Sequence, residues 1–467
     1  IHCGSLLLDV IPPERPYISK NLSLPESFYY DFNSETARNL FSSIESGKIS
    51  EILTKKYWLD LLFCLAYKKN PEIENLRKRF LAIQERYSQA SFLYDLVDRY
   101  SSFTNTIKLS SGMQSSKIAA QSPYPRTFAL MGETIAIEIK IAHLQYVIGL
   151  RDVLFQITSD YLDLWFVKNA IAIENEQLEI ISALETTVSE KFKAGLSLYE
   201  EVLKVQTMKF QVKLDLENYQ LRYKTLETKL LSMAGLPFGT ILGKPEIFRL
   251  EEINFDLAKM YSLADKNRLE IALMELQIQK QDRMIAMSKS ELYPLFTVGL
   301  SYYENKSGER AGSGERMESF TEKLEIEQPP TFGQGNSYIR EMEIEKEAME
   351  KQLVQLRSVD TIIQIQNIYY ELDKTRREEL LYRKNLIPLS QETLKTIQAA
   401  YRAPGNQSSL LNILDMQITL LNLQLSHEQS KKEILLKLAE LARLTSVNLE
   451  NELAKLTRHP TSNIIGH

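Results

Sequence analysis

Apolar residues recur at helical spacing over most of the chain, in segments longer than a compact core requires. One helix is predicted from about residue 130 to 193 and another from about 198 to 234. At 1.5 Å per residue, the first extends over roughly 95 Å. The second carries apolar residues that step by three and four positions, a pattern typical of helices packed side by side. This seam comprises Val202, Val205, Val212, Leu216, Tyr219, Tyr223, Leu226, Leu230 and Met233.

The same order of elements returns in the second half of the chain. Helices are predicted at about 264–290, 337–402 and 409–445, with a strand at 296–303 before the long helix. The first half likewise contains a helical region, here 49–89, before its long helix. Each half therefore runs helix, extended segment, long helix, turn and helix, which predicts an internally duplicated, mainly α fold of long antiparallel helices.

The two halves also match residue by residue. Phe192-Lys193-Ala194 aligns with Tyr401-Arg402-Ala403 at an offset of 209, and Val202-Leu203 aligns with Ile413-Leu414 at 211. The difference arises because the second turn is two residues longer. Two matched turns favour a returning bundle over a simple coiled-coil rod, which needs no such return.

Composition and charge argue against several classes of protein. Lys and Arg number 56 against 61 Asp and Glu, a net charge of −5, so we expect no nucleic-acid partner, because phosphate binding needs a concentrated basic face. No apolar run reaches 18 residues, which predicts no transmembrane helix. The five histidines lack metal-ligand spacing, and enzyme motifs are absent. We therefore expect a protein that is not an enzyme, with no cofactor and no metal site.

Several segments together resemble the TolC-like outer-membrane efflux family, over nearly all of residues 50–446. Residues 191–196, followed by Val202-Leu203 and Gln206, look like the turn-and-helix repeat of that family. Residues 385–389 and 401–403, followed by 411–417, look like its second copy. A further segment, 123–133, is similar to one typical of the heavy-metal (cation) efflux branch. The combined order, duplication and helix lengths carry the resemblance.

The resemblance implies a homotrimer that forms a TolC-like α-barrel, or tunnel, in the periplasm with small β-hairpin segments in the outer membrane. The partners would be a periplasmic adaptor, an inner-membrane RND-type pump and outer-membrane lipid. The protein would be a passive export channel for metal cations or small toxic compounds. Because the seam of the second helix would then pack against other helices of a closed ring, we expect no stable folded monomer.

The strand signals leave two alternatives open. A membrane strand needs about 9–11 residues that alternate between apolar and polar, and only 295–303 approaches this pattern. The return strand at 318–327 is acidic, and 101–122 is polar without alternation, so the first hairpin is reduced or missing. A barrel-less tunnel protein confined to the periplasm, or a structural coiled-coil protein, is therefore an alternative to the membrane channel.

The family pattern implies functional residues at the turns between the long helices. Its pair of entrance acids falls on Asn412 and Asp415, and Glu201 occupies the equivalent place in the first repeat. The spacing of three residues places Asn412 and Asp415 on one helix face. Near the start, Cys3 is a candidate for lipidation, with an unmodified thiol as the alternative because His2 precedes it. The turns expected to dock the adaptor contain Ala194, Gly195, Leu196 and Ser197, and Ala403, Pro404 and Gly405.

The expected organisation follows from these elements. It comprises an extended N-terminal tail (1–50), a first repeat (51–237) with its hairpin region at 92–126 and its turn at 194–197, a linker (238–257), a second repeat (258–446) with its hairpin at 295–327 and its turn at 403–408, and a polar C-terminal tail (447–467).

Overall fold

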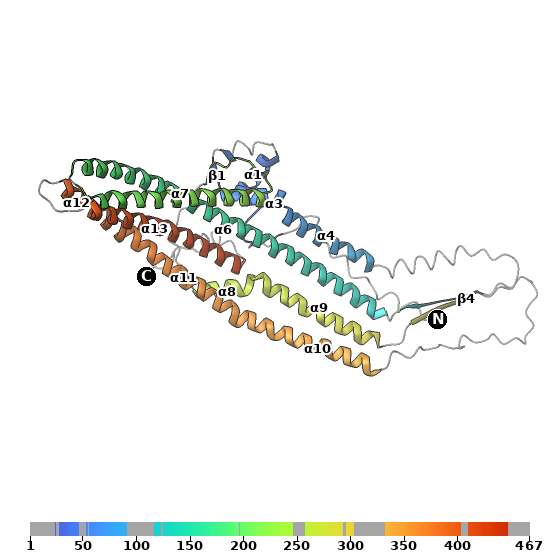
Figure 1. Ribbon diagram of the computed structural model, residues 1–467. Helices are drawn as coiled ribbons and strands as arrows, with labels where there is room; N and C mark the ends of the chain where they lie inside the picture. The colour runs from blue at the N-terminus through green and yellow to red at the C-terminus, as the bar shows by residue number, and fades with distance from the viewer. Residues whose placement is uncertain are drawn as a thin grey trace, which may run out of the picture. The chain divides into compact units, whose positions relative to one another are not determined.

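The computed structural model describes residues 24, 28–45, 53–54, 56–90, 116–122, 125–195, 197–245, 257–292, 296–302, 332–402 and 410–446. Within these residues the chain forms two compact units, which are described separately. The first unit is built from Leu76–Val147 and Leu269–Ser358, and the second from Pro25–Asn75, Ile148–Arg268 and the residues after Ser358. Long helices dominate both units, as the hydrophobic pattern predicts (Figure 1).

The described elements follow one another in an order that repeats. They are α1 (Glu35–Glu45), β1 (Lys56–Tyr57), α3 (Leu59–Lys69), α4 (Pro71–Ala90), β2 (Ser116–Ser122), α6 (Pro125–Lys193), α7 (Tyr199–Met233), β3 (Lys244–Pro245), α8 (Leu257–Asn267), α9 (Leu269–Glu291), β4 (Phe296–Tyr302), α10 (Phe332–Gln355), η1 (Leu356–Asp360), α11 (Thr361–Leu381), η2 (Tyr382–Leu386), α12 (Ile387–Arg402) and α13 (Leu410–Thr445). The segments η1 and η2 are π-helical turns. The run α3–α4, β2, α6, α7 is thus matched by α8–α9, β4, α10–α12, α13.

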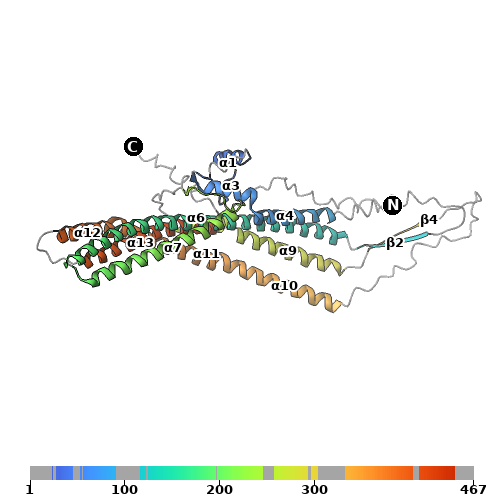
Figure 2. The same ribbon diagram turned by 45° about the horizontal axis from the view of Figure 1, so that its top comes forward.

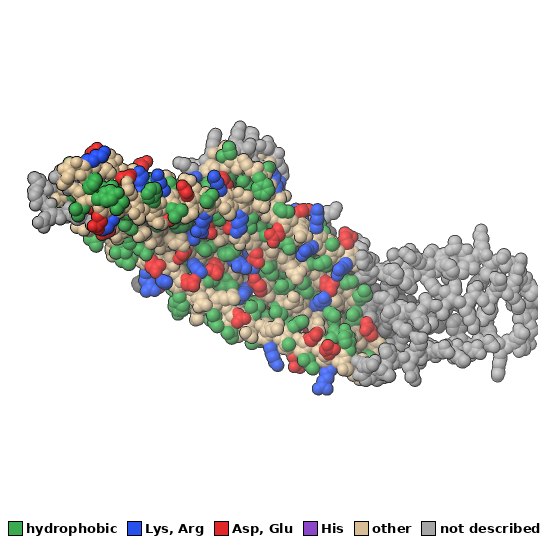
Figure 3. Space-filling model, in the orientation of Figure 1, with side chains coloured by type: hydrophobic (Ala, Val, Ile, Leu, Met, Phe, Trp, Pro, Cys, Tyr) green, Lys and Arg blue, Asp and Glu red, His purple; other side chains and the backbone are tan. Residues whose placement is uncertain are grey.

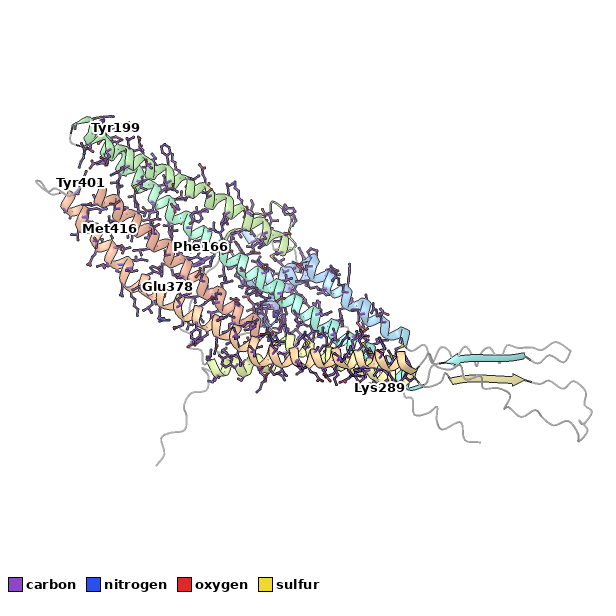
Figure 4. All side chains as sticks on the ribbon, turned by 60° about the horizontal axis from the view of Figure 1, so that its bottom comes forward. Phe166, Tyr199, Lys289, Glu378, Tyr401 and Met416 are labelled. Atoms are coloured by element: carbon purple, nitrogen blue, oxygen red, sulfur yellow. The ribbon has the colours of Figure 1, made fainter. Side chains whose placement is uncertain are left out.

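The first unit is held by a small apolar core and by ion pairs between its helices. Ile285 of α9 packs with Ile339 and Met342 of α10. Across the same helix pair, Lys289 Nζ lies 2.7 Å from a carboxylate oxygen of Glu343. Figure 4 labels Lys289 near the end of α9. Such exposed pairs contribute little individually, about 0–1 kcal/mol, so the apolar contacts set the packing and the charges favour one register.

A strand from each repeat forms the small sheet of the first unit. β2 pairs antiparallel with β4, with Ser116 opposite Tyr302 and Ser122 opposite Phe296. The sequence pattern predicted β4 but not β2, because 116–122 shows no alternation of apolar and polar residues. The return strand at 318–327 lies outside the described residues.

The second unit is a bundle of long helices packed lengthwise. Its main apolar cluster draws residues from four helices, which lie side by side in both Figure 1 and Figure 2. The cluster contains Ile181 and Val188 of α6, Val202, Val205 and Val212 of α7, Leu394 of α12, and Ile413, Leu414 and Leu420 of α13. These residues recur every three or four positions, so each helix is covered along its length rather than at one crossing point.

A short junction in the second unit ties the end of α7 to the start of α4. Asn70 caps α4, because its Oδ1 accepts hydrogen bonds from the backbone N–H groups of Glu72 (2.7 Å) and Ile73 (3.1 Å). Its Nδ2 donates to the carbonyl of Met233 at 2.7 Å. Gly235 follows with φ +65° and lies directly against the backbone of Lys69. An asparagine followed by a proline is a typical capped start of a helix.

Two features depart from the expected organisation. Residues 35–45, expected within an extended tail, form helix α1, and Ser34 Oγ accepts a hydrogen bond from the N–H of Ala37 at 3.2 Å. The prolines of this tail all precede residue 26 and disfavour a helix only near their own positions, so residues 35–45 can form a helix. The second long helix, predicted at about 337–402, contains the π-helical turns η1 and η2.

Replacing Gly235 with alanine should lower the free energy of unfolding by about 2–3 kcal/mol. An alanine at this position would have to adopt the left-handed backbone conformation, which is unfavourable for it. Its Cβ would also lie 2.6 Å from Lys69 Cβ, so the backbone must shift. Gly195→Ala is the matched control, because Gly195 also has positive φ but nothing lies within 4 Å of its added Cβ. It should cost only about 1 kcal/mol. Denaturant unfolding would measure both, and equal losses would contradict the role of the Lys69 contact.

Candidate functional site

The turn between α6 and α7 is short and closed by local hydrogen bonds. The N–H of Gly195 donates to the carbonyl of Phe192 at 2.9 Å, and Gly195 adopts φ +74°. After the turn, Ser197 Oγ donates to Glu201 Oε2 at 2.5 Å, which fixes the first turn of α7. Ala194 is exposed. The other predicted residues Leu196, Ala403, Pro404, Gly405 and Cys3 lie outside the described residues.

Two of the predicted entrance residues, Asp415 and Glu201, act electrostatically on Lys204, a lysine that the sequence pattern did not indicate. Asp415 and Asn412 are exposed on α13, and Glu201 is half-buried on α7. Lys204 bonds Glu200 at 2.8 Å. This bond, with the charges of Glu200, Asp415 and Glu201, raises the pKa of Lys204 above its ordinary value. Acids from both repeats therefore act on one ammonium group, and Lys204 partly offsets their charge.

A second link joins the two repeats near the same turn. The ammonium of Lys191, near the end of α6, bonds the hydroxyl of Tyr401, near the end of α12, and lies 3.7 Å from its ring centroid. Figure 4 shows Tyr401 on α12 and Tyr199 at the start of α7 at this end of the unit. Tyr401 is the repeat equivalent of Phe192, so the duplication has placed a different contact at each copy.

Helix α7 has two apolar faces. The face that was predicted to be covered by other copies is buried within the single chain. The predicted seam was expected to need other helices of a closed ring. Instead, Val202, Val205, Val212 and Leu216 are at most 8% exposed within the single chain. Val202, Val205 and Val212 pack in one cluster with residues of α6, α12 and α13. The expectation that a lone chain exposes this seam is therefore wrong.

The opposite face of α7 carries a stripe of exposed apolar side chains that the sequence analysis missed. Leu203, Phe210, Leu214 and Leu221 are 45–69% exposed and are spaced by seven, four and seven residues. Ile363 (49%) and Tyr370 (63%) are exposed on α11, also seven residues apart. Their spacing alone could have revealed them as second seams. Figure 3 shows hydrophobic side chains gathered on the surface near the start of α7.

The described part of the chain contains no cluster of side chains suited to binding a metal ion. None of its His, Cys, Asp and Glu residues gather in groups of three or more that could hold a metal ion. His427 Nε2 lies 3.2 Å from Glu379 Oε1, and the His427 side chain is 13% exposed, so it belongs to a polar contact between α13 and α11. Among the described helices, none combines the length and the apolar character needed to cross a membrane.

Comparisons with known proteins give a clear answer for the fold alone. Neither protein-family models nor curated proteins match the sequence. Solved structures do match over most of the chain. The outer membrane protein VceC from Vibrio cholerae is 13% identical, with 83% of this chain and 96% of VceC covered and a TM-score of 0.63.

Two further channels show the same likeness. The Campylobacter jejuni outer membrane channel CmeC is 11% identical, with 94% of this chain and 97% of CmeC covered and a TM-score of 0.58. The Neisseria gonorrhoeae outer membrane channel MtrE, in its open state, is 10% identical, with 84% and 89% covered and a TM-score of 0.61. The likenesses are of similar strength and do not single out a heavy-metal branch. At these identities they concern the fold, and the chain has the TolC-like fold of long helices that these outer-membrane channel proteins share.

Proposed function

We propose that this chain is the outer-membrane channel of a tripartite efflux system, a passive conduit that works with a periplasmic adaptor and an inner-membrane RND-type pump. The observation that carries the proposal is the likeness in fold over 83–94% of the chain to three outer-membrane proteins. Between 89% and 97% of each of those proteins is covered as well, so the likeness is not limited to one coiled-coil hairpin. This favours a channel over a structural rod.

The functional form is a homotrimer in this proposal. The exposed stripe on α7 supports it, because the seam on the other face is already covered within the chain and cannot mediate assembly. Each leucine or phenylalanine side chain that remains in water forgoes about 1.5–3 kcal/mol relative to full burial. Contact with α11 of a neighbouring copy, where Ile363 and Tyr370 are exposed, would cover both sets.

The turns Ala194–Ser197 and 403–408 form the adaptor-docking end in this proposal, and Asp415, Asn412 and Glu201 line the nearby entrance. Threefold symmetry would gather three copies of each acid around the axis. Asp415 and Glu201 both act on Lys204, and three copies of each acid around the axis would favour cations. Metal cations are accordingly the preferred cargo class, with small toxic compounds as the alternative.

Replacing Phe210 with glutamate should break the trimer while leaving the chain helical. The substitution puts a charge in the middle of the α7 stripe, where a neighbouring copy would have to desolvate it. Gln220→Glu is the matched control, at an exposed position of α7 outside the stripe. Analytical ultracentrifugation with circular dichroism would measure both. A Phe210→Glu protein that remains trimeric would show that the stripe lies outside the assembly surface.

Replacing Asp415 with asparagine should reduce cation selectivity about fivefold. Three charges at roughly 10 Å from a passing cation in water contribute about 1 kcal/mol together, and salt reduces this figure. Asn412→Asp is the complementary variant, since it adds a carboxylate on the same face of α13 and should raise selectivity. Reversal potentials in lipid bilayers at low salt would measure both. If neither variant shifts the reversal potential, Asp415 does not face the conduction path.

A photo-crosslinker placed at Ser197 should capture the purified adaptor, because this position lies at the turn between α6 and α7. The control is a crosslinker at Ser301 in strand β4, which should not capture it. Mass spectrometry would identify the crosslinked peptides. Capture from Ser301 and not from Ser197 would reverse the proposed orientation of the chain.

A further inference from the structure

A buried carboxyl group interrupts the apolar packing between α6 and α7 in the second unit. Glu174 of α6 is 3% exposed, and in the described part of the chain its Oε2 atom has no hydrogen-bond partner. Burying a carboxylate without a partner is costly, and such groups usually respond by taking up a proton. Neither the fold nor the proposed channel function accounts for this residue.

The carboxyl group lies at a specific level of the bundle, between two apolar clusters. On α6, Ile171 belongs to one cluster and Leu178 to the other. On α7, Tyr219 belongs to the same cluster as Ile171, and Val212 belongs to the same cluster as Leu178. Figure 4 labels Phe166, a core member of the first cluster, on α6. Glu174 therefore occupies the step at which the packing changes from one cluster to the next.

The charged group that acts on Glu174 in the described part of the chain is another acid, and a phenol lies in its field. On α7 these are the carboxylate of Asp215, which accepts a hydrogen bond from Gln211 Nε2 at 3.1 Å, and the phenol of Tyr219. Arg222 acts on Tyr219 from the next turn of α7. On α13, Glu428 is engaged elsewhere: it accepts from Asn169 Nδ2 of α6 (2.8 Å) and from Lys431 Nζ (2.7 Å).

We propose that Glu174 is a proton-controlled spacer in the α6–α7 pair. When it carries a proton, the two apolar clusters close over it. When it is ionised, it repels Asp215 and draws water between the two helices. The proposal concerns the packing of one chain, so it stands whether or not the protein is an efflux channel.

The electrostatics place this change near neutral pH. Burial, followed by the charge of Asp215, raises the pKa of Glu174 to about 7. In the unfolded chain the same group titrates near 4.3. Between these values the folded chain binds a proton that the unfolded chain has lost. The contribution of Glu174 to stability is therefore fully present below the unfolded pKa and is lost as the pH rises through about 7.

Hydrogen–deuterium exchange of the purified full-length protein at pH 5.5 and pH 8.5 tests the proposal, after correction for intrinsic exchange. Peptides covering 171–178 and 212–219 should open at least about tenfold more often at the higher pH, since one pKa unit corresponds to a tenfold change. Glu174→Gln should remove this dependence. Glu176→Gln, an exposed neighbour on α6, is the matched control and should behave as the unmodified protein.

A second variant keeps the test valid if Glu174→Gln does not fold. Asp215→Asn leaves Glu174 in place but removes the repelling charge, so the midpoint of the pH dependence should move to lower pH. Two results would overturn the proposal: equal opening of the α6–α7 peptides at both pH values in the unmodified protein, or a pH dependence that persists unchanged in Glu174→Gln. An unmoved midpoint in Asp215→Asn would also overturn it.

Discussion

The second unit depends on one constraint: a helix as long as α7, with 35 residues, must keep an apolar face covered along its length. A compact core covers such a helix at one crossing only, so the covering surface must itself consist of helices that run alongside it. α6, α7, α12 and α13 meet this requirement for one another, because each supplies residues to the same elongated cluster. The turns, the caps and the entrance acids are placed as a result of this packing.

Polar groups then fix the register that apolar packing leaves loose. Arg151 of α6 is almost fully buried and donates to Ser446 Oγ at 3.0 Å, next to the end of α13. Arg268 donates to Gln364 Oε1 at 3.1 Å and also bonds Thr361, at the start of α11. Sliding one helix by a turn would break the bond from Arg151 to Ser446 and the bonds from Arg268 to α11, and lost hydrogen bonds of buried charged groups are expensive. Apolar seams bring the helices together, and the buried arginines select one alignment.

The regular features of the fold could be predicted from the sequence because they are local. Three- and four-residue spacing marks the long helices, Asn70-Pro71 marks a capped start, and Gly235 marks a stop. Strand β2 could not be predicted, since it depends on a partner almost 180 positions away and lacks an alternating pattern. The same limit applies to the site. Asp415 and Glu201 were found by resemblance, whereas Lys204 becomes relevant only when α7 and α13 are placed together. Periodicity identified one apolar face of α7, and only the structure showed that the chain itself covers this face and leaves a second apolar face exposed.

The π-helical turns of the second repeat have a consequence for how the duplicated halves diverge. A π turn takes in one residue more than an α turn, and one residue corresponds to about 100° of rotation. Every side chain after η1 or η2 is thus rotated about the helix axis relative to an uninterrupted helix such as α6. Residues that align perfectly between the halves can point in different directions. A chimera that joins two copies of one repeat would preserve the order of the elements and still present a different surface to its neighbours.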